Sequence, residues 1–138
     1  MNATLAGALT VTLVLAAGGA LAEGDGARGE RLFNQQCKAC HTLDKGGHNL
    51  VGPNLHGLFG RKAGSADYQY SEAMKKSGIV WDEATLTEYL KEPKGKVPGT
   101  KMTYIGLRQE QQQQDMIAFL RYGITLWPLR LTYTDPGP

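Results

Sequence analysis

Two cysteines separated by two residues, with a histidine directly after the second, form the most chemically specific stretch of this chain. The stretch is Cys37-Lys38-Ala39-Cys40-His41, and its spacing is typical of covalent haem attachment. Each thiol can add across one vinyl group of a haem, and the short turn between the cysteines brings both sulfurs to one porphyrin edge. The imidazole of His41 then lies under the ring, where it can ligate iron. The motif therefore predicts one covalently bound haem c.

Three other interpretations of the two cysteines fit the chain less well. A redox-active disulfide of the thioredoxin kind would need a βαβ context, and none follows the motif. A zinc site needs four ligands; the sequence has no third cysteine, and His48 and His56 lie in a glycine-rich loop. A pair of inert buried thiols is the third alternative. Haem attachment is the favoured interpretation.

Helices must position this motif, and hydrophobic periodicity predicts four of them. The first covers residues 23–34, where Asp25 can cap the start and Gly29 and Phe33 share one face. A glycine on that face permits close approach of another helix, and the helix delivers Cys37. The remaining helices are expected at residues 71–77, 82–90 and 111–122, with Pro93 ending the third and Gly123 ending the last.

Two loops rich in glycine and proline are expected to complete the site. The first, residues 42–55, contains Pro53, which lacks an N–H but keeps a free carbonyl. A carbonyl behind His41 could accept the Nδ1–H hydrogen bond and fix the tautomer that leaves Nε2 for iron, and Pro53 is the candidate. The second loop, residues 97–105, is constrained by Pro98 and Gly99.

Length and composition indicate one small exported domain. The chain has 138 residues and a net charge of +2, so it has no strong nucleic-acid signature. Residues 1–22 carry no charged side chain, and Ala20-Leu21-Ala22 matches a small-x-small cleavage pattern. An uncleaved membrane anchor is the alternative, although a run this rich in Ala, Gly and Thr would span poorly. We expect a signal peptide (1–22), a haem domain (23–123), a C-terminal extension (124–138) and a periplasmic location.

Further motifs occur in a fixed order downstream of the haem motif. They are Gly52-Pro53-Asn54-Leu55-His56-Gly57-Leu58-Phe59-Gly60-Arg61-Lys62, Gly78-Ile79-Val80-Trp81, Glu88-Tyr89-Leu90-Lys91-Glu92-Pro93-Lys94, Pro98-Gly99-Thr100-Lys101-Met102 and Asp115-Met116-Ile117-Ala118-Phe119-Leu120. Together they resemble the class I, mitochondrial-type cytochromes c and their soluble bacterial counterparts, over about residues 24–122. The resemblance implies a small all-α fold in which three to five helices wrap around one haem.

The resemblance also implies a second iron ligand. Met102 matches the methionine that supplies it, in the rigid loop after Pro98 and Gly99. A thioether is soft and neutral, so it favours Fe(II) and raises the reduction potential. Tyr89 matches a tyrosine whose hydroxyl approaches the axial sulfur, and Thr100 matches a threonine that helps to order the same pocket.

The haem propionates need hydrogen-bond donors, because they carry negative charge into a partly buried site. Arg61, Tyr70 and Trp81 match the family residues that serve this purpose, and the guanidinium of Arg61 offers a bidentate fork. The pattern departs from the family at Met74, where a polar asparagine is common. For Met74 and Met116 core packing is the simpler expectation.

A six-coordinate iron in a dry, rigid pocket suits outer-sphere electron transfer, and the sequence shows neither an open iron site nor an acid/base group beside one. We therefore expect a soluble, monomeric periplasmic electron carrier rather than an enzyme. It would accept electrons from a membrane quinol-oxidising complex or a dehydrogenase and donate them to an oxidase, a reaction centre or a reductase. The alternative is a haem enzyme or gas sensor in which Met102 dissociates.

Lysines near the expected haem edge would steer the acidic docking surfaces of these membrane redox complexes. They are Lys38, Lys62, Lys94, Lys96 and Lys101. Gln36 and Gln109 stand where many relatives are basic, so the electrostatic docking should be weaker than in the mitochondrial protein.

The C-terminal residues 124–138 lie outside the resemblance. They include Leu126, Trp127 and Tyr133, which are unusual in a disordered tail. Because Pro128 should bar continuation of the last helix, we expect an extended segment with one apolar face. That face could pack on the domain itself or on a partner, while residues 136–138 should fray.

Overall fold

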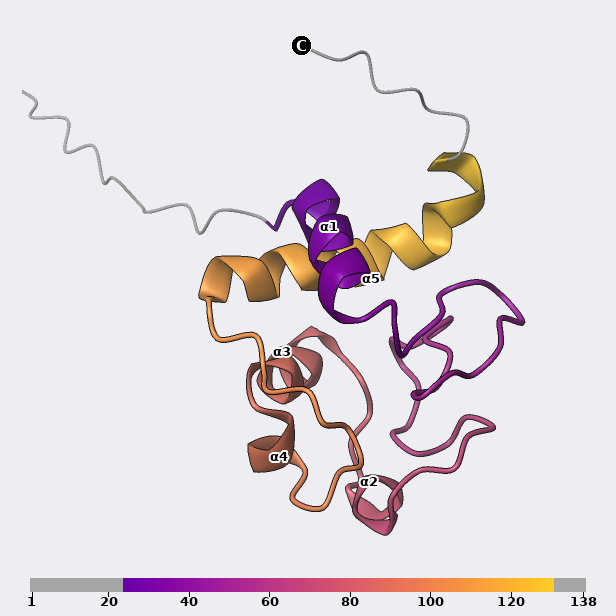
Figure 1. Ribbon diagram of the computed structural model, residues 1–138, viewed down its shortest axis with the longest axis vertical. Helices are drawn as coiled ribbons and strands as arrows, with labels where there is room; N and C mark the ends of the chain where they lie inside the picture. Colours follow the sequence, from indigo (N-terminus) through magenta and orange to yellow (C-terminus); the bar gives the residue numbers. More distant parts are fainter. Residues whose placement is uncertain (1–23, 131–138) are drawn as a thin grey trace, which may run out of the picture.

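The computed structural model describes residues 24–130, with side-chain environments from Gly24 to Tyr122. Over this range the chain forms five helices and no strand: α1 (Gly26–Gln36), α2 (Glu72–Lys76), α3 (Glu83–Lys91), α4 (Pro93–Lys96) and α5 (Glu110–Arg130). Figure 1 shows α1 crossing α5 at one end of the domain, with α3, α4 and then α2 toward the other end. The expected all-α fold with three to five helices is confirmed for this part of the chain.

Helix α1 begins at Gly26, directly after its cap Asp25 and three residues later than the predicted start at residue 23. The Asp25 carboxylate accepts hydrogen bonds from the backbone N–H groups of Ala27 and Arg28, which satisfies two donors that the first turn leaves unpaired. Gly29 and Phe33 are the buried residues of the helix. The helix extends two residues beyond the predicted end at residue 34 and finishes with Cys37 as its C-cap.

The crossing of α1 over α5 is unusually close because glycine faces the partner helix. A Cβ built on Gly29 would lie 2.0 Å from the carbonyl oxygen of Asp115 and 2.6 Å from Cβ of Phe119. The rings of Phe33 and Phe119 pack on the same side with centroids 5.5 Å apart. The absence of a side chain at Gly29 therefore sets how far α1 sits from α5.

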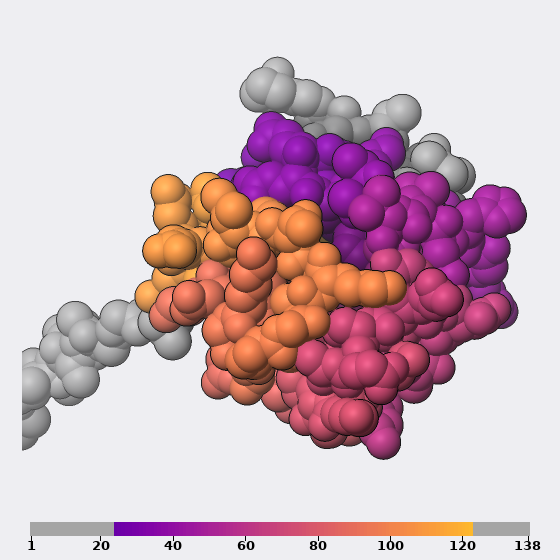
Figure 2. Space-filling model, turned by 60° about the horizontal axis from the view of Figure 1, so that its bottom comes forward, coloured from indigo at the N-terminus to yellow at the C-terminus, as the bar shows by residue number. Residues whose placement is uncertain are grey.

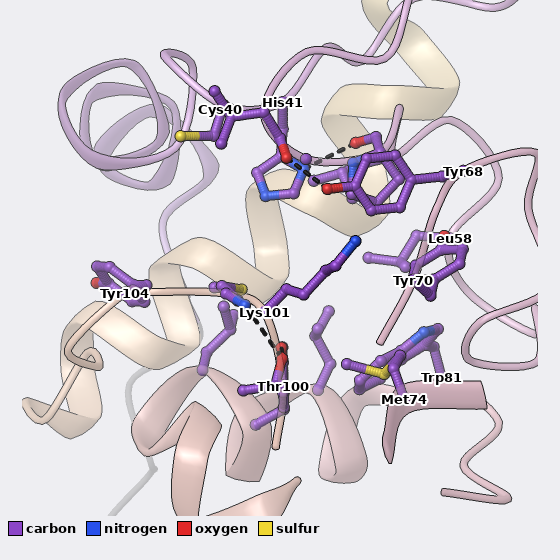
Figure 3. Close-up of a pocket in the computed structure, with 18 of the residues that line it drawn as sticks. Cys40, His41, Leu58, Tyr68, Tyr70, Met74, Trp81, Thr100, Lys101 and Tyr104 are labelled. Carbon is purple, nitrogen blue, oxygen red and sulfur yellow. Dashed lines mark hydrogen bonds between the residues drawn. The ribbon is translucent and has the colours of Figure 1, made fainter. Parts of the chain in front are cut away.

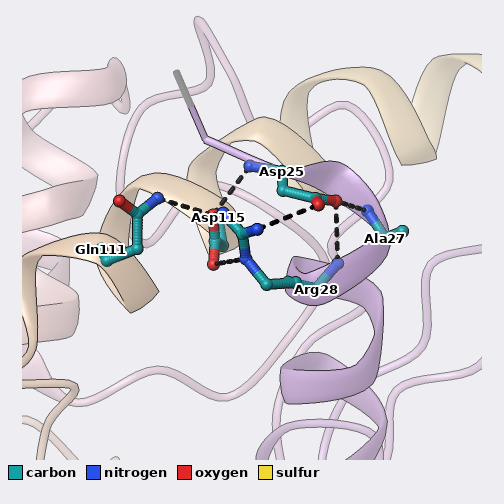
Figure 4. A network of polar contacts seen from close by, with 5 residues as sticks. All are labelled: Asp25, Ala27, Arg28, Gln111 and Asp115. Carbon is teal, nitrogen blue, oxygen red and sulfur yellow. Dashed lines mark hydrogen bonds and ion pairs between the residues drawn. The ribbon is translucent and has the colours of Figure 1, made fainter. Parts of the chain in front are cut away.

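A buried carboxylate fastens the same crossing (Figure 4). Oδ2 of Asp115 accepts a bond of 2.8 Å from Nε of Arg28, and Oδ1 accepts one of 3.0 Å from Nη2. The backbone N–H of Asp25 and the side chain of Gln111 also donate to Oδ1, at 2.7 and 3.0 Å. These hydrogen bonds, that from Arg28 foremost, lower the pKa of Asp115 to about 2 although burial opposes the shift. The charge links the first and last helices.

The shorter helices follow local signals. Asp82 and Thr85 form a capping box at the start of α3, and α3 ends before Pro93, as predicted. Pro93 then opens a further short helix, α4, because proline is well tolerated in a first helical turn. Ser71 caps α2 by accepting a hydrogen bond from the N–H of Met74.

The predicted stop at Gly123 is wrong, since α5 continues to Arg130. A glycine inside a helix costs only about 1 kcal/mol and removes no backbone hydrogen bond. Pro128 also lies inside the helix, so the expected extended segment is wrong as far as Arg130; proline forfeits one bond and bends a helix rather than always ending it. Figure 1 shows the yellow end of α5 turning away from the direction of its orange beginning.

Other expectations for the termini fall outside the described residues, namely the signal peptide (1–22) and the structure of residues 131–138. The proposed boundary between domain and extension, after residue 123, lies within α5. Among residues 24–130, no helix combines the length and the apolar character that a membrane crossing requires.

One polar side chain of α5 is buried. Gln113 is only 5% exposed, although its glutamine neighbours are good helix formers that suit a solvated turn. Its side-chain amide donates a hydrogen bond of 2.6 Å to the backbone carbonyl of Leu107. Gln113 therefore ties the loop before α5 to the helix, whereas Met116, as expected, is a core residue that is 1% exposed.

Candidate functional site

A cavity of about 520 Å³ lies between the loops and helices α3 and α5, a volume typical of cofactor sites. Its walls are largely apolar and include Leu58, Trp81, Leu86, Leu90 and Leu120. Figure 3 shows Cys40 and His41 on one side, Thr100, Met74 and Trp81 on the other, and the chain of Lys101 between them. Nine of the ten predicted site residues line this cavity; Cys37, at the end of α1, does not.

The cysteine motif continues α1 as a tight turn. The backbone N–H groups of Cys40 and His41 both donate to the carbonyl of Cys37, at 2.9 and 3.0 Å. Both cysteines are free and partly buried in this structure. Burial, with a contribution from Cys40, raises the pKa of Cys37 to about 11 and keeps it a neutral thiol.

The ring of His41 is fixed from behind. Its Nδ1 donates a hydrogen bond of 2.7 Å to the carbonyl oxygen of Pro53, the acceptor that the sequence suggests. This bond selects the tautomer whose Nε2 is free to bind a metal. Burial lowers the pKa of His41, and the bond to Pro53 opposes this only in part, so the imidazole favours its neutral, ligating form.

Gly52 provides the room for that ring. A Cβ added at Gly52 would lie 2.3 Å from Cε1 of His41, so any larger residue would displace the imidazole. The backbone N–H of Gly52 donates to the carbonyl of Cys40 at 2.8 Å, which holds the loop against the haem motif. The position therefore belongs to the site, although it contributes no side chain.

Met102 lines the cavity from the loop between α4 and α5. Its backbone N–H donates to Oγ1 of Thr100 at 3.3 Å, and the hydroxyls of Thr100 and Tyr89 share a hydrogen bond of 2.8 Å. Burial raises the pKa of Tyr89, so its phenol stays protonated. The ring of Tyr89 packs on Trp81 with centroids 5.1 Å apart. The Met102 loop is thus anchored to α3 through neutral groups.

Arg61 and Tyr70 supply polarity to an otherwise apolar cavity. The guanidinium of Arg61 donates to the backbone carbonyls of His56, at 3.0 Å, and Asn54, at 3.3 Å, which fixes its position. Burial raises the pKa of Tyr70, partly offset by the positive charge of Arg61. These groups can serve the acidic end of a cofactor while the rest of the cavity stays dry.

Sequence reasoning left three of the aromatic and sulfur-containing cavity residues without a role in the site: Tyr68, Met74 and Tyr104. The hydroxyl of Tyr68 donates to the carbonyl of Val51 and so closes the first loop. Met74 is 6% exposed, as its core assignment predicts, but its side chain also lines the cavity. For Tyr104 the sequence offers only its position, two residues after Met102.

The remaining histidines take no part in the cavity lining. His48 is exposed, and its backbone carbonyl accepts a hydrogen bond from the hydroxyl of Thr42. His56 has a buried Nδ1 without a hydrogen-bond partner. Within the described part of the chain no group of three His, Cys, Asp or Glu residues could hold a metal ion, so the zinc alternative finds no support.

The donor set fits a covalently attached haem. A free thiol pair follows α1, a neutral imidazole and a thioether face one cavity, and an arginine and a phenol lie at its polar part. The imidazole occupies the space that the missing side chain of Gly52 leaves open. Imidazole and thioether together are a recognised haem ligand pair in electron-transfer proteins.

Comparisons with known proteins agree with this geometry. The family model for cytochrome c matches residues 26–123. Cytochrome c of Theileria annulata is 54% identical over 99 residues, covering 72% of this chain and 86% of the relative. Cytochrome c of Stellaria longipes is 49% identical over 100 residues, covering 72% and 93%. Cytochrome c-554 of Methylosinus trichosporium is 49% identical over 114 residues, covering 82% and 86%.

Proposed function

This chain belongs to the cytochrome c family and carries one covalently attached haem c, and on this premise we propose that it is a soluble periplasmic carrier of single electrons with His41 and Met102 as axial ligands. The observation that carries the proposal is the meeting of a neutral imidazole and a thioether in one largely apolar cavity beside the two free cysteines. When bound, the haem supplies an iron that gains and loses one electron.

The residues of the chain limit how much the site must rearrange during that exchange. The carbonyl of Pro53 holds the His41 ring in one tautomer, and Gly52 has no side chain that would compete with the ring for space. The hydroxyls of Tyr89 and Thr100 hold the Met102 loop without any group that changes charge. The apolar walls exclude water, whose reorientation would otherwise oppose electron transfer.

Export is supported by the uncharged residues 1–22 and the cleavage pattern at Ala20–Ala22. Attachment of c-type haem outside the cytoplasmic membrane agrees with a periplasmic location. The relatives named cytochrome c come from eukaryotes, and the bacterial cytochrome c-554 matches a larger share of this chain. Detection of a mature chain that begins at Glu23 in the periplasmic fraction is the expected result.

We propose that this protein is a monomer and that its partners are membrane redox complexes with acidic docking surfaces. Lys38, Lys62 and Lys94 are exposed and form no ion pair in the described structure, so their charges are available for steering. Lys96 is already paired with Glu88, and Lys101 donates to the carbonyl of Gln69. The electrostatic attraction should therefore be modest.

An apolar contact can supplement these charges. Val51, which lines the cavity, is 77% exposed, and Ile105, next to the cavity residue Tyr104, is 84% exposed. Exposed apolar side chains beside a cofactor site favour close contact with a partner. We expect the partner to present an apolar surface surrounded by carboxylates.

The rival function, a haem enzyme or gas sensor, requires Met102 to leave the iron. The test compares wild-type protein with Met102→Ala, and with Met116→Leu as a control in the core. The wild type and the control should show the weak far-red band of Met-ligated ferric haem and bind imidazole slowly. Met102→Ala should lose the band and have a lower potential. A wild type that lacks the band or binds imidazole rapidly would favour the rival function.

A further inference from the structure

The loop that carries Met102 has few attachments to the rest of the domain. In the described structure the backbone of residues 101–106 forms no hydrogen bond to another segment, and the next such bond joins the N–H of Leu107 to Leu90. Two side chains hold the loop from either end. Lys101 donates to the carbonyl of Gln69 at 2.6 Å, and the hydroxyl of Tyr104 donates to Oε1 of Gln36 at 2.6 Å.

The bond between Tyr104 and Gln36 joins a wall of the cavity to the end of α1. Gln36 is the last residue of α1 and directly precedes Cys37, whereas Tyr104 lies two residues after Met102 and lines the cavity. In Figure 2 orange atoms from the later part of the chain abut purple atoms from its beginning on one face of the molecule. The residues are 68 positions apart, so no local structure holds them together.

Both partners are uncharged in the folded protein. Burial raises the pKa of Tyr104, so the phenol keeps the proton that it donates. The hydrogen bond therefore depends neither on an ion pair nor on a residue that ligates metal. It is also separate from the anchor formed by Tyr89 and Thr100 on the other flank of Met102.

We propose that Tyr104 and Gln36 form a latch that positions the Met102 loop against the cysteine-bearing end of α1, so that opening of the latch precedes displacement of Met102. The proposal rests on the proposed function only in taking Met102 as an axial ligand. Tyr104 and Gln36 are positioning residues, because they act on Met102 through the loop. Loss of the latch should open the loop while the crossing of α1 and α5 stays intact.

The test uses the haem-loaded protein in four forms: wild type, Tyr104→Phe, Gln36→Met and the double variant. Tyr122→Phe, an exposed tyrosine on α5, is the matched control. Two rates are measured. One is amide hydrogen exchange, by NMR, at Met102 and Leu107, whose N–H groups donate to Thr100 and Leu90. The other is imidazole binding to the ferric protein. Each single variant should raise both rates about fivefold, the effect of losing one ordinary hydrogen bond. The double variant should exceed neither single variant, because the two residues share one bond.

Unchanged rates in Tyr104→Phe, or single effects that add in the double variant, would overturn the latch. An equal rise in exchange across α1 and α5 would also overturn it, since that result indicates general destabilisation. The two proposals fail separately. If the wild type lacks the far-red band while exchange at Met102 and Leu107 still rises about fivefold in both single variants, the latch stands and ligation by Met102 falls.

Discussion

Replacing Gly29 with alanine tests how tightly the crossing of α1 and α5 determines stability. The new Cβ would lie 2.0 Å from the carbonyl oxygen of Asp115, whereas ordinary contact begins at 3.4 Å, so the helices must separate by 3.4 − 2.0 = 1.4 Å. The nearest atoms are the backbone carbonyl of Asp115 and Cβ of Phe119, and neither can rotate out of the way. Movement of whole helices is the only available response.

The expected cost follows from three contributions. Overpacking of this kind costs about 1–3 kcal/mol, and alanine returns about 1 kcal/mol through its higher helix propensity. The separation also stretches the hydrogen bonds from Arg28 and the N–H of Asp25 to Asp115, each worth about 1 kcal/mol. We expect a net loss of about 2–3 kcal/mol in the free energy of unfolding, or a fall of roughly 10–15 °C in Tm for a domain of this size.

Chemical denaturation of the haem-loaded protein, followed by far-ultraviolet circular dichroism, measures this free energy. Gly26→Ala is the matched control, because it lies in the same helix and its Cβ would be 3.9 Å from Cα of Phe119, an ordinary contact. The control should change stability by less than about 0.5 kcal/mol. Equal stabilities for Gly29→Ala and Gly26→Ala would refute the close-packing argument.

Three further outcomes are expected. Asp115, whose pKa Arg28 holds at about 2 against an ordinary value of 3.8, should stabilise the fold above pH 4 and lose this contribution as the pH falls toward 2. Asp115→Asn should therefore lower the free energy of unfolding at pH 7 by about 1–2 kcal/mol, a figure reduced because Arg28 is partly solvated. The difference in this free energy between variant and wild type, measured by denaturation, should disappear in acid. Gly52→Ala should displace the His41 ring and shift the potential measured by redox titration; an unchanged potential would show that the ring tolerates the methyl group. The rate of reaction with an acidic redox partner should fall as the Debye length shortens from about 30 Å at 0.01 M salt to about 8 Å at 0.15 M, less steeply in Lys38→Gln than in wild type, whereas a salt-independent rate would remove the lysines from docking.

Features that depend on neighbours in the sequence were predictable. The caps at Asp25 and Asp82 and the break before Pro93 each involve residues within one helical turn. The haem motif likewise needs only five consecutive residues. The pairing of His41 with Pro53 spans 12 positions, and chemical reasoning about the free proline carbonyl still found it.

Features that depend on the sum of many weak interactions, or on contacts between distant residues, were not predictable from the sequence. The stop at Gly123 failed because a local penalty of about 1 kcal/mol is small beside what a long helix can recover. The buried amide of Gln113 and the bond between Tyr104 and Gln36 depend on where loops fold back. No periodicity in the sequence encodes such contacts.

The pairing of α1 with α5 also has a consequence for the order of events during biosynthesis. The helix that leads into the cysteine motif packs chiefly on residues 115–119, which leave the ribosome about 80 positions after that motif. Until those residues are available, α1 has no surface against which to bury Phe33, and Arg28 lacks the carboxylate of Asp115. A growing chain therefore keeps both thiols in an open, unassembled segment. Only a chain that includes α5 can close the domain around the haem attached to them.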